Sequence, residues 1–232
     1  MHASGSDGEG SGELLGRRGA AAVRAFKKTE QHPVVDATGF DTQKYAPWCN
    51  VRTGEPSQRT TFRKSHVIAG YWWKGILSHA VTEGHRHDAP VFSQLMKKLP
   101  DGDYECMSGG TAYCSRKNCT LVRQHHMQSF FKPRRNATAK AKGSTAWRDM
   151  VRCWNDDRQR FDESYHRRSV VESVIGAEKQ RLGHTLFSRR ATLQDKELRL
   201  KTICHNLLVV NKMKASQVLG EPPLQPVPRT DT

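Results

Sequence analysis

An α/β fold with a sheet of mixed strand direction is predicted from the order of patterns along the chain. Short β-favouring runs come first, a strand–helix–strand pattern follows, and only helical patterns come after residue 145. Apolar residues make up 36% of the 232 residues, which is low for a chain that is packed throughout. The folded domain is therefore predicted to span residues 32–213.

Both ends of the chain are predicted to lie outside this domain. Residues 1–31 are rich in glycine and include a basic stretch, so they bury little and are expected to form a flexible lead. Residues 214–232 contain four of the ten prolines and are expected to form an extended tail.

Five strands are predicted before residue 133. The first run follows Pro33 and is broken by Gly39, and the second and third runs are joined by a tight turn near Lys74 and Gly75. The fourth run ends at a pair of glycines. The predicted ranges are 34–40, 66–73, 75–81, 104–108 and 128–132.

Five helices are predicted from apolar residues at helical spacing. Asp88 and Pro90 are start signals for the first of them. The predicted ranges are 89–99, 115–124, 145–157, 161–181 and 196–213.

The chain has a formal net charge of +15, from 38 Lys and Arg against 23 Asp and Glu. This excess makes a polyanion the first partner to consider, and nucleic acid above all. No acidic residue lies between Glu105 and Asp149. Lys132, Arg134 and Arg135 lie in this segment and are predicted to bind DNA phosphates. A merely solvated basic loop is the alternative, and the net charge favours the phosphate-binding interpretation.

The sequence shows no sign of a membrane span or a signal peptide. Its longest apolar runs are far shorter than the roughly 18 residues of a membrane helix. The six cysteines are therefore expected to be thiols in a reducing compartment. Zinc at Cys106, Cys114 and Cys119 is a less favoured alternative, because a Cys-x-x-Cys pair is missing. A soluble, intracellular protein is expected.

Four polar residues of the predicted helix 161–181 share one stripe. Tyr165, Arg168, Glu172 and Lys179 have offsets of 0, 3, 7 and 14, which place them within an arc of about 60° on an α-helix. A carboxylate between two cations suits a metal-holding acid beside groups that bind phosphate. A surface helix with intrahelical ion pairs fits the same spacing equally well.

The residue types at these positions favour the first interpretation. Y-x2-R-x3-E-x6-K resembles the signature around the last acid of a large group of DDE insertion-sequence transposases, and every interval matches. Upstream, Asp36 before Thr38-Gly39 resembles the strand that carries the family's first catalytic acid. Downstream, Glu197 and the helix that follows resemble its closing helix. The resemblance covers about residues 32–211.

The resemblance implies an RNase H-like fold, with a mixed five-stranded sheet flanked by helices. It also implies that Asp36 and Glu172 are catalytic and bind two Mg²⁺ or Mn²⁺ ions, whereas Tyr165, Arg168 and Lys179 orient or clamp DNA phosphates. The implied activity is DNA strand cleavage and strand transfer of an insertion sequence. The implied partners are element ends, target DNA and a second copy in a homodimeric synaptic complex. A cytoplasmic, nucleoid-associated location is expected.

The chain departs from the family pattern at the second acid. The family has Asp-x-x-Tyr followed by Asn five residues after the Tyr, and the best match here begins with Gly110 and continues to Tyr113 and Asn118. Asp101 begins another Asp-x-x-Tyr, and Asp103 lies beside it, but no Asn follows at the required place. Gly110 is therefore the favoured position of the missing acid.

This departure leaves alternative functions open. One is an impaired transposase, and another is an inactive, truncated relict that only binds DNA. Residues 1–31 are also too short for the separate region that reads terminal repeats in such enzymes. An unrelated, basic RNA-associated protein is the least favoured alternative.

Overall fold

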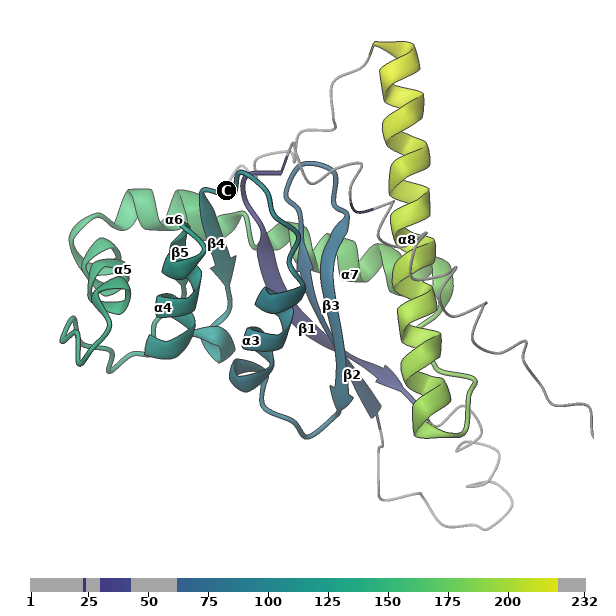
Figure 1. The fold of residues 1–232 in the computed structure, drawn as a ribbon, viewed down its shortest axis with the longest axis horizontal. Helices are drawn as coiled ribbons and strands as arrows, with labels where there is room; N and C mark the ends of the chain where they lie inside the picture. Colours follow the sequence, from purple (N-terminus) through teal and green to yellow (C-terminus); the bar gives the residue numbers. More distant parts are fainter. Residues whose placement is uncertain (1–22, 24–29, 43–61, 221–232) are drawn as a thin grey trace, which may run out of the picture.

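The computed structural model describes residues 23, 30–42 and 62–220, and these form one sheet with helices on both faces (Figure 1). The sheet has five strands in the order β3-β2-β1-β4-β5. Their bounds are β1 Val34–Asp41, β2 Phe62–Ala69, β3 Ile76–Glu83, β4 Cys106–Gly109 and β5 Gln128–Phe131.

The sheet is mixed because its two halves are connected differently. Strands β1, β2 and β3 pair antiparallel as consecutive neighbours, whereas β4 pairs parallel with both β1 and β5. Parallel neighbours need crossover connections, and helices follow β3 and β4 to supply them. The prediction of an RNase H-like, mixed five-stranded sheet flanked by helices is confirmed.

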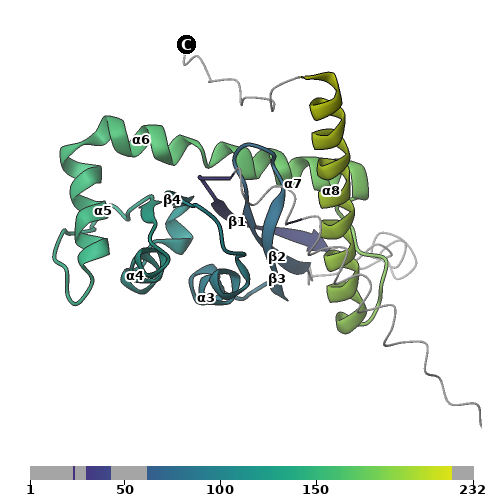
Figure 2. The same ribbon diagram turned by 45° about the horizontal axis from the view of Figure 1, so that its top comes forward.

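The helices cover the two faces of the sheet unequally. Helices α3 and α4 lie on one face, and α6 and α7 run across the other, as the two views show (Figures 1 and 2). Helix α5 packs on α4 and β5, and α8 packs beside β3 and β2. The bounds are α3 Asp88–Lys98, the 3₁₀ turn η1 Thr111–Tyr113, α4 Arg116–Gln124, α5 Thr145–Asp156, α6 Arg158–His166, α7 Ser169–Leu182 and α8 Ala191–Leu219.

Alternation along β1 divides the core between the two faces. Val35 belongs to the large cluster under α3 and α4, whereas Val34 packs with Val170, Val171 and Val174 of α7. Successive side chains of a strand point to opposite faces, so Asp36 lies on the same face as Val34, towards α7.

The second and third strands are displaced from their predicted ranges. The aromatic run at Trp72 and Trp73 lies in the connection between β2 and β3 and not in a strand. The backbone N–H groups of these two residues donate to the Glu30 carboxylate, at 2.9 and 2.7 Å. Glu30 is fully buried, although the sequence placed it in the flexible lead. The carboxylate of Glu30 therefore accepts from backbone N–H groups that would otherwise be available for pairing within the sheet.

The helical region after residue 157 also differs from its prediction. The predicted helix 161–181 is two helices, α6 and α7, separated at Arg167 and Arg168. Val170 N–H and Val171 N–H donate to carbonyls three residues earlier, which makes the junction a tight turn. Helix α8 continues to Leu219, so residues 214–219 of the expected tail are helical. Residues 1–22, 24–29 and 221–232 of the predicted lead and tail lie outside the described residues.

Within the described part of the chain, none of the helices combines the length and the apolar character needed to cross a membrane.

Candidate functional site

The site is centred on one arginine that binds two acids. Arg168 Nη2 donates to Asp36 Oδ2 at 2.7 Å, and Arg168 Nη1 donates to Glu172 Oε1 at 3.0 Å. The side chains of Arg168 and Asp36 are 26% and 20% exposed, whereas that of Glu172 is 55% exposed. One guanidinium therefore holds the two predicted catalytic acids side by side, although they are far apart in sequence.

The sheet brings a third position to the same place. β1 and β4 pair in register only at Val34 with Ser108 and Val35 with Gly109. The residues that follow these pairs are Asp36, which lies inside β1, and Gly110, which comes directly after the last residue of β4. They meet at the carboxyl end of β4, and ligands of α/β sheets commonly bind at the carboxyl ends of parallel strands.

Gly110 faces the guanidinium of Arg168. A Cβ atom built on Gly110 would lie 3.5 Å from Arg168 Nε and 3.9 Å from Cζ, and these are ordinary contact distances. Arg168 Nε is buried and has no hydrogen-bond partner among the described residues. Asp101 and Asp103 lie exposed in the segment before β4. Gly110 therefore lies against the guanidinium that binds the two acids.

Burial and charge act in opposite directions on this cluster. Burial raises the pKa of Asp36, and the nearby Glu172 raises it further. Arg168 lowers this pKa, as does the Ala37 N–H, which lies 2.9 Å from Asp36 Oδ1. The net shift of the Asp36 pKa is upward. Burial lowers the pKa of Arg168, but Asp36, Tyr165 and Glu172 raise it and the net shift is upward. The arginine stays charged and neutralises one of the two carboxylates.

The residues present do not fit the pair of divalent ions that the resemblance implies. Asp36 and Glu172 supply oxygen donors, but the Arg168 guanidinium lies between them and the third position is glycine. Within the ranges that the structure describes, no three Asp, Glu, His or Cys side chains are grouped so that they could hold a metal ion. A two-ion site shares its ligands among three acids, and this cluster is one carboxylate short.

The other two residues of the signature have no bond to either acid, although the Tyr165 carbonyl accepts from the Arg168 N–H at 2.9 Å. Tyr165 belongs to α6, where its ring stacks on Phe161 with centroids 5.9 Å apart. Lys179 lies further along α7, with Nζ 5.2 Å from the ring centroid of Phe40 on β1. The single stripe predicted for all four signature residues is therefore broken at the α6–α7 junction, and only Arg168 and Glu172 meet Asp36.

The predicted phosphate-binding residues of the basic segment follow β5. Lys132, Arg134 and Arg135 are exposed in the segment between β5 and α5. Lys132 N–H donates to the carbonyl of Gly109 at 3.3 Å, which ties the start of this segment to the end of β4. The basic segment and the acid cluster thus lie at the same edge of the sheet.

Comparison with known proteins identifies the family of this chain. No protein with curated annotation matches the chain. A solved structure described as "Mos1 transposase paired-end complex with left transposon end" matches at 11% identity with a TM-score of 0.28, over 75% of this chain and 64% of that chain. The family model for the transposase DDE domain matches residues 27–207. The chain belongs to the transposase DDE domain family.

Proposed function

We propose that this chain binds DNA at the Asp36–Arg168–Glu172 cluster as a DDE transposase domain, and that its strand cleavage and strand transfer are impaired. The observation that carries the proposal is the position of Gly110 against the guanidinium that already binds Asp36 and Glu172. The backbone of a three-acid site is present, but it carries only two acids.

The charge of the cluster supports both halves of this proposal. Two carboxylates and one guanidinium leave about one negative charge, which balances little of the charge that two divalent ions would bring. The removal of one charged group from a preorganised site commonly lowers a rate by about a hundredfold or more. DNA binding has no such requirement, because the surrounding basic residues supply the attraction for phosphate.

The proposed DNA contacts are Arg168 of the cluster, two further signature residues, and the basic residues that follow β5. Arg168 can exchange its bond to the exposed Glu172 for a DNA phosphate, because a half-exposed carboxylate is a weakly held partner. Lys179 and Tyr165 would contact the strand on the α6–α7 side, and Lys132, Arg134 and Arg135 on the β5 side. The proposed partners are element ends and target DNA, with two copies of the chain in a synaptic complex.

Plasmid nicking in Mg²⁺ or Mn²⁺ tests the impairment. We expect Gly110→Asp to nick supercoiled DNA at least about a hundredfold faster than the native chain. Adding Asp36→Asn to that variant should abolish the gain. The matched control is Asp101→Asn, which removes an exposed acid from the segment before β4 and should change neither rate. Equal nicking by the native chain and Gly110→Asp would refute the assignment of Gly110.

The second candidate function is a relict that binds DNA without cleaving it. The Arg168 guanidinium between Asp36 and Glu172 favours this candidate, since it fills the space that a cation would need. Long incubation of the native chain in Mn²⁺ separates the two. Slow nicking that disappears in Glu172→Gln supports the impaired enzyme, whereas no nicking together with DNA binding in EDTA supports the relict. A chain that binds no DNA in either condition contradicts both.

A further inference from the structure

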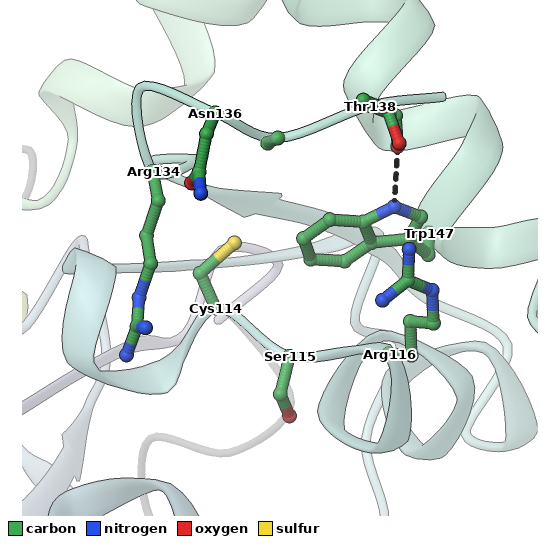
Figure 3. A pocket seen from close by; sticks show the side chains of 8 residues that line it. Cys114, Ser115, Arg116, Arg134, Asn136, Thr138 and Trp147 are labelled. Carbon is green, nitrogen blue, oxygen red and sulfur yellow. Dashed lines mark hydrogen bonds between the residues drawn. The ribbon is translucent and has the colours of Figure 1, made fainter. Parts of the chain in front are cut away.

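A second basic site is a cavity of about 420 Å³ at the start of α4. Its wall is formed by the residues before and at the start of α4, by the segment after β5, and by the start of α5. Figure 3 shows Arg134 and Asn136 on one side, Trp147 and Arg116 on the other, and the Cys114 thiol between them. The cavity is open to solvent, so a group carried on a longer molecule can enter it.

Arg116 is held in a fixed position in this cavity. Its Cζ atom lies 4.7 Å from the centroid of the Trp147 ring, and Nη2 donates to the carbonyl of Lys140 at 3.3 Å. Trp147 is fixed in turn, because its Nε1 donates to the carbonyl of Thr138 at 2.9 Å, the dashed line of Figure 3. Arg116 Nε is buried and has no hydrogen-bond partner among the described residues.

The positive charge of this cavity is not balanced from within. No acidic side chain lines it, and no carboxylate of the described residues pairs with Arg116 or Arg134. Burial raises the pKa of the Cys114 thiol to about 12, so the thiol stays neutral. A half-buried guanidinium without a counterion is costly to hold, and a ligand anion would remove that cost.

Neutral groups in the same wall suit a phosphate. Ser115 caps α4, its Oγ accepting from the Asn118 N–H at 3.1 Å, so the positive end of a nine-residue helix lies at the cavity. The side-chain amide of Asn136 adds a donor opposite Arg116. Two guanidinium groups with neutral donors and no acid form a typical environment for a phosphate group.

The cavity lies close to the acid cluster along the chain and in space. Cys114 follows Gly110 by four residues, which limits their Cα separation to about 14 Å, and the 3₁₀ turn η1 between them makes it shorter. Gly110, which contacts Arg168 of the acid cluster, follows β4, and the wall of the cavity that carries Arg134 follows β5. One DNA strand can therefore reach both sites with phosphates that are a few nucleotides apart.

We propose that this cavity is a binding site for a backbone phosphate of DNA, held between Arg116 and Arg134. The inference rests on the proposed DNA binding and adds a subsite to it. The bound group is a phosphate, and we propose that it belongs to a DNA strand that also contacts the Asp36–Arg168–Glu172 cluster.

DNA affinity of matched arginine variants tests the subsite. Arg134→Gln removes an exposed guanidinium that lines the cavity, and Arg152→Gln removes an exposed guanidinium of α5 that does not. With the full chain, a fluorescent duplex and EDTA, we expect Arg134→Gln to weaken binding about tenfold and to reduce the salt slope by about one. Arg152→Gln should weaken it less than about twofold. Equal losses in the two variants would overturn the subsite while leaving DNA binding intact, and failure of the native chain to bind would overturn the proposed function instead.

Alkylation of Cys114 distinguishes DNA from free phosphate. Peptide mass spectrometry follows N-ethylmaleimide labelling of each cysteine, with the exposed Cys204 on α8 as the internal reference. We expect the duplex to slow labelling of Cys114 at least about fivefold and to leave Cys204 unchanged. Inorganic phosphate at matched ionic strength should protect Cys114 far less. Equal protection by inorganic phosphate, or labelling of Cys114 that is unchanged by bound DNA, would contradict the proposal.

Discussion

Gly109 and Gly110 are adjacent at the end of β4, yet only Gly110 has room for a side chain. A Cβ atom on Gly109 would lie 2.6 Å from Val35 Cγ1 and 3.0 Å from the ring of Phe131, whereas one on Gly110 would lie 3.5 Å from its nearest neighbour, Arg168 Nε. The glycine at 109 is required because the side chains of Val35 on β1 and Phe131 on β5, the two neighbours of β4, fill the space above it. The glycine at 110 is not required by space.

This contrast predicts opposite effects of the same substitution on stability. Gly109→Ala should lower the free energy of unfolding by about 1–3 kcal/mol, because the added methyl group overpacks a filled core. Gly110→Ala should change it by less than about 0.5 kcal/mol. Urea unfolding of the two variants measures both values. Similar losses in both would show that the space beside Gly110 is filled.

Replacing Arg168 should destabilise the fold through Asp36. Arg168→Met keeps an unbranched side chain but removes the guanidinium, which leaves the mostly buried Asp36 without its ion pair and next to the like charge of Glu172. We expect a loss of about 2 kcal/mol in the free energy of unfolding at pH 7. Arg152→Met on α5 is the matched control and should be neutral. An unchanged stability for Arg168→Met would mean that solvent already screens the pair.

Glu178 of α7 should make stability depend on pH. Its side chain is 1% exposed and accepts a hydrogen bond from Thr202 Oγ1 at 3.3 Å. Burial raises the pKa of Glu178 from an ordinary 4.5 to about 7, although Thr202, Lys201 and Lys179 act to lower it. The folded state therefore holds this proton more tightly than the unfolded state, so the stability contributed by this group is present below about pH 4.5 and is lost as the pH rises to about 7.

Glu178→Gln removes this dependence, because glutamine does not titrate. Glu178→Gln should raise the melting temperature above that of the native chain by more at pH 8 than at pH 5. The corresponding gain in the free energy of unfolding should differ between the two pH values by on the order of 2 kcal/mol. Thermal unfolding at the two pH values measures it. A gain that is the same at both values would exclude Glu178 as the titrating group.

Asn206 of α8 should be important for the edge of the sheet. Its Oδ1 accepts from Ile76 N–H and its Nδ2 donates to Ile76 O, both at 2.8 Å, and all of these groups are buried. Asn206→Ala leaves two buried backbone groups without partners, so we expect a loss of about 2–4 kcal/mol. Leu207→Ala, a partly exposed neighbour on the same helix, should cost about 1 kcal/mol or less. Urea unfolding tests the pair, and equal losses would contradict the role of the amide.

Local patterns predicted an α/β fold with a mixed sheet, and the family resemblance added that the fold is RNase H-like. The helices α3, α4 and α5 begin and end within one residue of the predicted ranges, because each has apolar residues at helical spacing with Ser or Asp near its start. Some errors are local, such as the turn that divides the predicted helix 161–181 into α6 and α7. The displaced hairpin is an error in which a distant residue decides the local structure. Glu30 binds the backbone at Trp72 and Trp73 and so moves the hairpin, and no periodicity in the sequence reports such a contact.

The residues of the candidate site could be predicted from the sequence, but the ion pairs between them could not. The resemblance to the family signature singled out Arg168 and Glu172, and the resemblance of residues 34–40 to the family's first strand singled out Asp36. Their pairing through Arg168 depends on how α7 crosses β1, which only the packed structure defines. The same holds for Arg116 and Trp147, since the acid-free segment marked the charge of Arg116 but nothing in the sequence joined it to that ring.

The unhindered position of Gly110 also bears on the history of this gene. Every glycine codon is a single base change away from a codon for aspartate or glutamate. Because a Cβ atom at position 110 would meet only ordinary contacts, an acid could be placed here by one point mutation. Under the proposed function, a lineage carrying this chain would remain one substitution away from a complete set of acids for as long as the surrounding fold is preserved.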